Sequence, residues 1–397
     1  MMRLVTLFAV AVLGCGCTSV TTDARPRIPA PAVTISPSPG EFRARPDQGL
    51  VVQVRDGTLA AVTAFAEGKR IPGEFDDSRT NWRSTWTLPP GVEHVVNVTA
   101  TGDAGPVREA ARFRTLPTSG SAGDVAISPL PGQVTGVGMP IVVTFATPVT
   151  DRAAVERALE VKAAKPVEGA WRWFGPSQVV YRTRRFWPAR QKIVLIAHLA
   201  GVRIAPGVYG SADRTVPFTV SRKQISTVDT LAHRMVVRRG DEVVRSIPVS
   251  AGRGTSWEYT TTSGVHLVID KGNPVRMVSP GRVQGEPGYY DKLISYAVRI
   301  SDSGEYVHAF NNISAQGRQN VSHGCVNVSP ADAAWFYAHS LPGDPVLITG
   351  TNRELEPENG WGFWQLSWSQ WRAGSALHAT KPVNSLITPR LSRVSDM

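Results

Sequence analysis

The sequence predicts a mainly β protein, in which two tandem immunoglobulin-like β-sandwiches precede a β-rich third domain with one main helix and a Trp-rich C-terminal extension. The motif VTISPSPG at 33–40 recurs as VAISPLPG at 125–132, and each copy is followed by short β-rich runs between turn signals. The 30 prolines and 36 glycines among 397 residues favour many turns, and this length exceeds that of one ordinary core.

The repeats give the limits that we expect for the two sandwiches. The first occupies residues 33–121 and the second residues 122–222, with a short helix near residues 151–160. Each copy closes on a similar strand, ARFRTL at 111–116 and TVPFTV at 215–220. Sandwiches of this kind need no disulfide, so the lack of paired cysteines in these segments does not argue against them.

Residues 223–350 are predicted to form the third domain. The run RMVVRR, a Gly-Asp turn and EVVRSIPVS indicate a β-hairpin. The main helix is expected at residues 329–340, because Ser329 can cap it, Pro330 suits its first turn and Asp332 completes a capping-box-like pattern. Further strands are expected at 264–270, 294–301 and 305–310.

The Trp-rich extension covers residues 351–397 and contains WGFWQLSWSQWRAG. We expect these tryptophans to form a buried or half-buried strap on the third domain, and a platform that stacks on carbohydrate is the alternative. The last twenty residues are expected to be loose.

The N-terminus resembles a lipoprotein leader. Residues 1–14 are predicted to be a signal peptide, whose apolar stretch at 4–13 is too short to span a bilayer as a helix. VLGC resembles a bacterial lipobox, which implies lipidation of Cys15 and an anchor and tether over residues 15–32. Cys17 lacks the aliphatic residue three positions upstream. A plain cleaved signal with incidental cysteines is the alternative. The expected location is the cell membrane, on its extracytoplasmic face, with activity in the cell wall.

The charge balance restricts the partners. A formal charge of +11 suits anionic polymers of the cell envelope or lipid head groups. No dense Lys/Arg tract with interleaved aromatics is present, so nucleic acid is not expected as a partner. No other segment reads as a membrane span, and we expect a monomer.

The chemistry centres on VSHGCVN at 321–327. Of three cysteines, Cys15 and Cys17 lie in the predicted anchor, so Cys325 has no disulfide partner and is a candidate reactive thiol. A thiol needs a base to form the nucleophilic thiolate, and a nearby imidazole such as that of His308 could accept its proton. Gly324 adds no side-chain bulk, so a substrate carbonyl and backbone N–H donors could approach the sulfur closely.

Two other interpretations of the same residues stay open. Cys325 could be a small buried hydrophobe beside a core histidine. Alternatively, His308, His323 and Cys325 could bind zinc, although no CxxC or HxxxH spacing supplies a fourth ligand. The corresponding functions are a non-catalytic, cell-wall-binding lipoprotein and a zinc-dependent peptidoglycan hydrolase. We expect neither a metal nor a cofactor.

The residues from His308 to Asn327, with Ser322-His323-Gly324-Cys325 between them, resemble the catalytic motif of the L,D-transpeptidases, which have a YkuD-type catalytic domain. The likeness extends to mycobacterial-type members, which combine an anchor, tandem immunoglobulin-like domains and a tail similar to WSQWRAG. It implies an acyltransferase with a cysteine nucleophile that joins peptidoglycan stem peptides.

The resemblance also implies a role for each site residue. Cys325 would be the nucleophile and His308 the general base, held by the carbonyl of Ala309. Backbone N–H groups of Gly324 and Cys325 would form the oxyanion hole, helped by the hydroxyl of Tyr290. This tyrosine belongs to GYYDK at 288–292, in a flap that would cover the donor site, and the adjacent Tyr289 could take the same role. The residues expected to bind or shape the substrate site are Tyr290, Ser322, His323, Asn327 and His266.

The substrates implied by the resemblance are two stem peptides. The donor would be a tetrapeptide stem cut after the L-centre of meso-diaminopimelate, which releases D-alanine. The acceptor would be a side-chain amine of another stem, giving a 3→3 cross-link. Inhibition by carbapenems is expected. A thioester would conserve the free energy of the cleaved peptide bond where no ATP is available.

Overall fold

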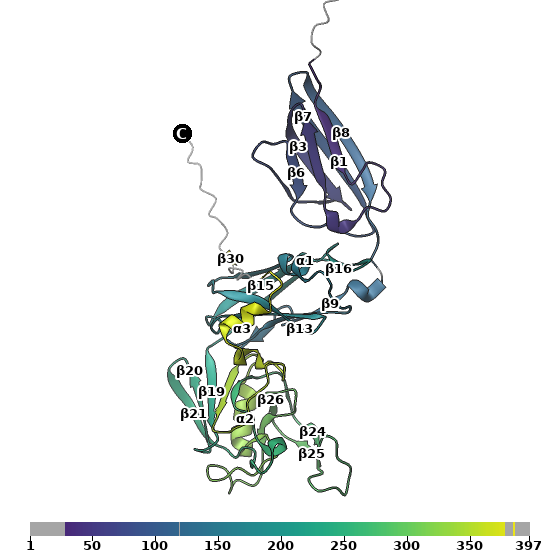
Figure 1. Ribbon diagram of the computed structural model, residues 1–397. Coiled ribbons are helices and arrows are strands. Elements are labelled where there is room, and N and C mark those ends of the chain that lie inside the picture. The colour runs from purple at the N-terminus through teal and green to yellow at the C-terminus, as the bar shows by residue number, and fades with distance from the viewer. Residues whose placement is uncertain (1–27, 119, 378–383, 386–397) are drawn as a thin grey trace, which may run out of the picture.

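The computed structural model describes residues 28–118, 120–377 and 384–385, which form three bodies in a row (Figure 1). The predicted signal peptide, Cys15 and Cys17 lie outside these described residues, as do most of the last twenty residues. Within the described part, no helix is long and apolar enough to cross a membrane.

The first sandwich packs two four-stranded sheets face to face. Strand β7 alternates buried and exposed positions along its sequence EHVVNVTATG, as a strand covering a core on one face must. One sheet has the order β1 (Ala32–Ser36), β2 (Val51–Arg55), β6 (Asn81–Ser84), β5 (Gly73–Phe75). The other has the order β4 (Lys69–Arg70), β3 (Thr58–Ala66), β7 (Glu93–Gly102), β8 (Gly105–Arg114).

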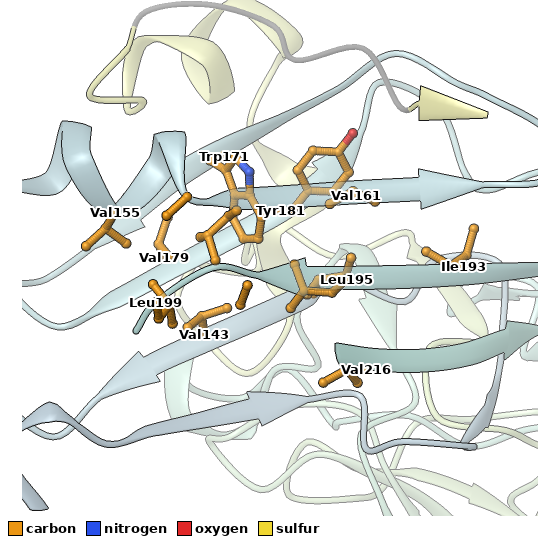
Figure 2. Packing of buried hydrophobic residues seen from close by; sticks show 14 of the residues in the cluster. Val143, Val155, Val161, Trp171, Val179, Tyr181, Ile193, Leu195, Leu199 and Val216 are labelled. Carbon is orange, nitrogen blue, oxygen red and sulfur yellow. The ribbon is translucent and has the colours of Figure 1, made fainter. Parts of the chain in front are cut away.

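The second sandwich encloses a core dominated by aliphatic and aromatic side chains, including Trp171 and Tyr181 (Figure 2). The predicted helix is α1 (Arg152–Arg157), where the Asp151 side chain accepts a hydrogen bond from Ala154 N–H. One sheet has the order β10 (Val134–Thr135), β18 (Arg214–Val220), β15 (Gln191–Ala197), β12 (Leu159–Ala163), β30 (Asn384–Ser385). The other is β13 (Gly169–Phe174), β14 (Gln178–Thr183), β11 (Ile141–Phe145), β9 (Val125–Ser128), and β16 (Arg203–Ala205) pairs with β17 (Val208–Tyr209).

The third domain contains a five-stranded sheet, a four-stranded sheet and a two-stranded hairpin. The predicted hairpin is β20–β21, turned at Gly240 with φ 61°. The larger sheet has the order β21 (Glu242–Pro248), β20 (Arg234–Arg239), β19 (Gln224–Asp229), β29 (Pro345–Thr349), β22 (Gly264–Leu267). The smaller has the order β23 (Lys271–Gly272), β26 (Ala297–Arg299), β27 (Tyr306–Ala309), β28 (Val326–Val328), and β24 (Val275–Val278) pairs with β25 (Asp291–Ile294).

The main helix of this domain is α2 (Pro330–His339), close to the predicted range. The Ser329 hydroxyl accepts a hydrogen bond from Asp332 N–H and donates one to the Asp332 carboxylate. Phe336 and Ala333 face the core that the two sheets share with the helix. The cap thus fixes the start of α2 directly after β28.

The Trp-rich extension differs from the expected strap on the third domain, because its tryptophans pack mainly on the second sandwich. Helix α3 (Trp368–Ala373) lies beside β13, where Trp371 is fully buried and its indole N–H donates to the Ala170 carbonyl at 2.9 Å. The Arg182 guanidinium covers this ring at 4.6 Å from its centroid. Gln365, in the 3₁₀ turn η4 (Gly362–Gln365), accepts a bond from Val265 N–H of the third domain. The extension therefore ties the two bodies together.

Candidate active site

Strands β27 and β28 place His308 and Cys325 on one face of a strand pair. They pair in parallel, with Val307 opposite Val326 and His308 opposite Asn327. Both valines are fully buried in the core of the domain. Because side chains alternate along a strand, His308 and Cys325 leave the pair on the face opposite those valines. A separation of 17 positions in the sequence thus becomes two positions along the strand pair, although His308 itself does not line the cavity.

Cys325 is a free, half-buried thiol at a cavity of about 410 Å³. Its sulfur lies 3.6 Å from the carbonyl oxygen of Gly304. Burial raises the pKa of this thiol to about 12, partly offset by a hydrogen bond from the backbone of Tyr306. Residues lining the cavity include Cys325, Gly324, His323, Tyr290, Tyr306 and Glu305.

His308 is a buried imidazole in the right tautomer to act as a base. Its Nδ1 lies 2.9 Å from the carbonyl oxygen of Ala309, which can only accept, so Nδ1 carries the proton and Nε2 has a free lone pair. Burial lowers the pKa of His308, against a smaller upward effect of the Ala309 bond. The imidazole is therefore neutral at physiological pH.

The turn before β28 is held by Ser322. The hydroxyl of Ser322 donates to the Cys325 carbonyl at 2.6 Å and accepts from Gly324 N–H at 3.0 Å. Gly324 has φ 127°, which a residue with a side chain rarely adopts. Ser322 is buried and does not line the cavity, so it positions the nucleophile's turn and is out of reach of a substrate.

The structure corrects one predicted donor of the oxyanion hole, the Gly324 N–H. Because Ser322 already accepts this hydrogen bond, Gly324 N–H does not face the cavity as a free donor. The remaining predicted donors are the Cys325 N–H and the hydroxyl of Tyr290.

Comparison with known proteins agrees with this geometry. Residues 223–348 match the family described as the L,D-transpeptidase catalytic domain, YkuD, and residues 41–203 match a bacterial Ig domain family. L,D-transpeptidase 2 of Mycobacterium tuberculosis is 33% identical over 353 residues, which cover 87% of this chain and 85% of that protein. The chain belongs to the L,D-transpeptidase family. The predicted family, enzyme class and fold class are confirmed.

Two more members of the transpeptidase family show similar likeness. L,D-transpeptidase 5 of Mycobacterium tuberculosis is 32% identical over 371 residues, which cover 90% of this chain and 80% of that protein. A crystal structure of L,D-transpeptidase 3 from Mycobacterium tuberculosis, in complex with a faropenem-derived adduct, is 32% identical; the match covers 59% of this chain and 100% of that chain, with a TM-score of 0.48.

The structure distinguishes the two adjacent flap tyrosines of this transpeptidase. Tyr290 lines the cavity with Cys325, whereas Tyr289 does not. Ser279 fixes its position, because Ser279 N–H donates to the Tyr290 carbonyl and Tyr290 N–H donates to the Ser279 hydroxyl. Burial and the charge of an ionised Cys325 raise the pKa of Tyr290, so its phenol stays a hydrogen-bond donor.

We expect Tyr290→Phe to lower transpeptidase turnover by about tenfold, because it removes one oxyanion donor while the Cys325 N–H remains. KM for the donor should change little, since the hydroxyl acts on charge that develops only in the transition state. Steady-state kinetics on a stem-peptide donor measures both constants. Tyr289→Phe is the matched control, and an equal loss there would contradict the assignment to Tyr290.

His266 and Asn327 do not contact the cavity. The His266 side chain is fully buried, with Nε2 2.8 Å from the Thr262 hydroxyl, so the prediction that it binds substrate is wrong. Asn327 is buried as well, and its backbone N–H and C=O pair with Ser250. Both side chains are covered by the rest of the domain and do not line the cavity.

His323, like Tyr290, is a predicted substrate residue that does line the cavity. The Arg253 guanidinium lies 3.2 Å from its Nε2, which therefore accepts, and burial with the charges of Arg253 and Arg282 lowers the pKa of His323. The Tyr259 ring packs edge-on to His323 at 4.7 Å between centroids.

Sequence reasoning missed two residues that line the cavity, Glu258 and Tyr259. Glu258 lies in the 3₁₀ turn η3 (Trp257–Tyr259). It pairs through both carboxylate oxygens with Arg282, in the loop of the flap that joins β24 to β25. The Tyr259 ring lies beside the same guanidinium, at 5.7 Å. No motif marks the segment SWEYTTTSG, and only the fold brings it within reach of the flap.

Proposed function

We propose that this chain forms 3→3 cross-links between peptidoglycan stem peptides through a thioester on Cys325. The single observation that carries the proposal is a free thiol at a cavity, on the strand next to a buried neutral imidazole whose Nε2 can accept a proton. Membership of the transpeptidase family supports acyl transfer as the reaction type.

The first half-reaction forms the thioester. The Cys325 sulfur attacks the carbonyl carbon at the L-centre of meso-diaminopimelate, and the thiol proton passes to His308 Nε2. The oxyanion accepts hydrogen bonds from the Cys325 N–H and the Tyr290 hydroxyl. The C–N bond then breaks, and His308 returns the proton to the amine of the departing D-alanine.

The second half-reaction transfers the acyl group. A side-chain amine of the acceptor stem attacks the thioester carbonyl and gives a proton to His308, while the C–S bond breaks and the sulfur recovers its proton. The peptide bond formed replaces the one cleaved, so no nucleotide is consumed.

The proposal is tested by incubating the purified chain with disaccharide-tetrapeptide stems and analysing the products by mass spectrometry. We expect one D-alanine released for each cross-linked dimer, with no loss of activity in EDTA. Release of D-alanine without dimers would show that water is the acceptor. Zinc at one equivalent, removed by EDTA together with activity, would favour a zinc hydrolase instead. Among the described residues, no three His, Cys, Asp or Glu side chains are grouped to hold a metal.

We also propose that the enzyme is anchored by a lipid on Cys15 to the outer face of the cell membrane. The support is the leader sequence VLGC after a ten-residue apolar run. Cys15→Ala should release the protein from the membrane fraction or block its maturation, because the acylated residue is missing. Immunoblots of membrane and soluble fractions measure this, with Cys17→Ala as the matched control. Unchanged membrane attachment of the Cys15 variant would contradict the anchor.

A further inference from the structure

A buried carboxylate lies at the active-site cavity, next to the nucleophile. Glu305 is only 5% exposed, yet it lines the cavity with Cys325. Its two oxygens accept hydrogen bonds from the Thr262 N–H at 2.7 Å and the Thr262 hydroxyl at 2.6 Å. His266 Nε2 lies 3.4 Å from the second oxygen. None of the steps proposed above uses this carboxylate.

Glu305 is held in its ionised form. Burial by itself raises the pKa of a carboxyl group, but the neighbouring imidazole of His266 and the hydrogen bonds from Thr262 more than offset it, so the pKa of Glu305 is lowered. A buried charge with this many donors is fixed in place.

The sulfur contacts the backbone on both sides of Glu305. Cys325 Sγ lies 3.6 Å from the carbonyl oxygen of Gly304, and the backbone of Tyr306 makes its other hydrogen bond. A Cβ added at Gly324, directly before Cys325, would lie 4.0 Å from Glu305 Cγ. The carboxylate is therefore a near neighbour of the sulfur, in a partly desolvated place.

Two neighbours of the sulfur, the Gly304 carbonyl and the Glu305 carboxylate, favour its protonated form, and only the backbone hydrogen bond from Tyr306 favours the thiolate. A carbonyl oxygen accepts a bond from S–H but offers nothing to a thiolate, and a carboxylate repels negative charge. The other charged groups at the cavity are largely matched, since Glu258 pairs with Arg282 and Arg276 pairs with Asp291. The remaining titratable groups around the sulfur are Tyr259, Tyr290, Tyr306, His323 and Arg353 at the cavity and His308 on β27.

We propose that Glu305, held by Thr262 and His266, is a positioning residue that keeps Cys325 as a neutral thiol in the resting enzyme, so that His308 takes the proton only during attack on a bound substrate. The proposal rests on the role of Cys325 as the nucleophile. A neutral sulfur reacts slowly with oxidants and electrophiles other than the substrate, which protects a lone nucleophile outside the cytoplasm.

The test is the rate at which iodoacetamide alkylates Cys325 in the full chain, followed against pH. Only the thiolate displaces iodide, so the rate reports the ionised fraction. The alkylated peptide that contains Cys325 is quantified by mass spectrometry, because the chain has two other cysteines. For the unaltered protein we expect the rate to keep rising above pH 10.

Glu305→Gln removes the charge but keeps a carbonyl oxygen for Thr262 and a similar shape. We expect the alkylation profile to move down by about one pH unit or more, which makes alkylation at pH 8 about tenfold faster. Glu305→Asp keeps the charge and is the matched control, with a profile close to that of the unaltered protein. Thermal melting of each variant shows that it is folded.

Two results would overturn the inference. One is a folded Glu305→Gln variant whose Cys325 is alkylated no faster than in the unaltered protein. The other is a half-maximal rate near pH 8.5 in the unaltered protein, the value of a free thiol, which decides the matter even if the Gln variant does not fold. Neither result depends on cross-linking, so the proposed transpeptidation stands or falls separately.

Discussion

Replacing Cys325 with alanine is expected to reduce stem-peptide cross-linking to the uncatalysed background and to abolish covalent capture of a carbapenem. In the proposed reaction the donor is linked covalently to the enzyme only through this sulfur, and no other described residue is a cysteine. The β-lactam carbonyl of a carbapenem is a strained amide, so the same attack opens its ring and leaves the drug as a thioester.

Intact-mass spectrometry measures the capture directly. The unaltered protein should gain the mass of one carbapenem, and the Cys325→Ala variant should gain none. Cys17→Ala is the matched control and should keep the single adduct, because that cysteine lies in the predicted anchor. Cross-linked dimers formed by the alanine variant would place the nucleophile elsewhere in the chain.

The sequence predicted the parts of this protein that depend on local pattern. The repeated ISP-x-PG motif indicates two sandwiches because similar sequences adopt similar folds. The motif around Cys325 indicates the nucleophile because His323 and Gly324 directly precede it in the sequence. Helix α2 could be located because Ser329 and Asp332 cap it through side chains only three residues apart.

What sequence reasoning missed depends on contacts between distant segments. His266 alternates with apolar residues on β22, and nothing local shows that its inward face meets Thr262 and Glu305. The tryptophans of the extension were predicted to be buried, but the surface that covers Trp371 comes from β13, about 200 residues earlier. The loss of Gly324 N–H as an oxyanion donor follows from how the Ser322 hydroxyl is turned, which a motif does not specify.

His308→Ala is expected to slow both cross-linking and carbapenem acylation by about 10²- to 10⁴-fold at neutral pH, the usual range for losing a general base. The loss should be large here because burial raises the pKa of Cys325 to about 12, so very little thiolate forms without a proton acceptor. His308→Gln should be equally slow, since an amide can donate to the Ala309 carbonyl but does not take a proton. His198→Ala, in the second sandwich, is the matched control and should keep full activity.

The pH dependence separates a base from a merely structural histidine. Burial lowers the pKa of His308, so its neutral, basic form persists below the usual range, and the unaltered enzyme should lose activity only at a pH below about 6.5. At pH values above about 6.5, the acylation rate of the unaltered enzyme should stay level. The alanine variant has to wait for the thiol to ionise alone, so its acylation rate should rise about tenfold for each unit of pH. Stopped-flow or mass-spectrometric acylation rates between pH 6 and 10 would show this slope, and a variant whose rate is flat over the range would mean that His308 supports the fold of the site without accepting the proton.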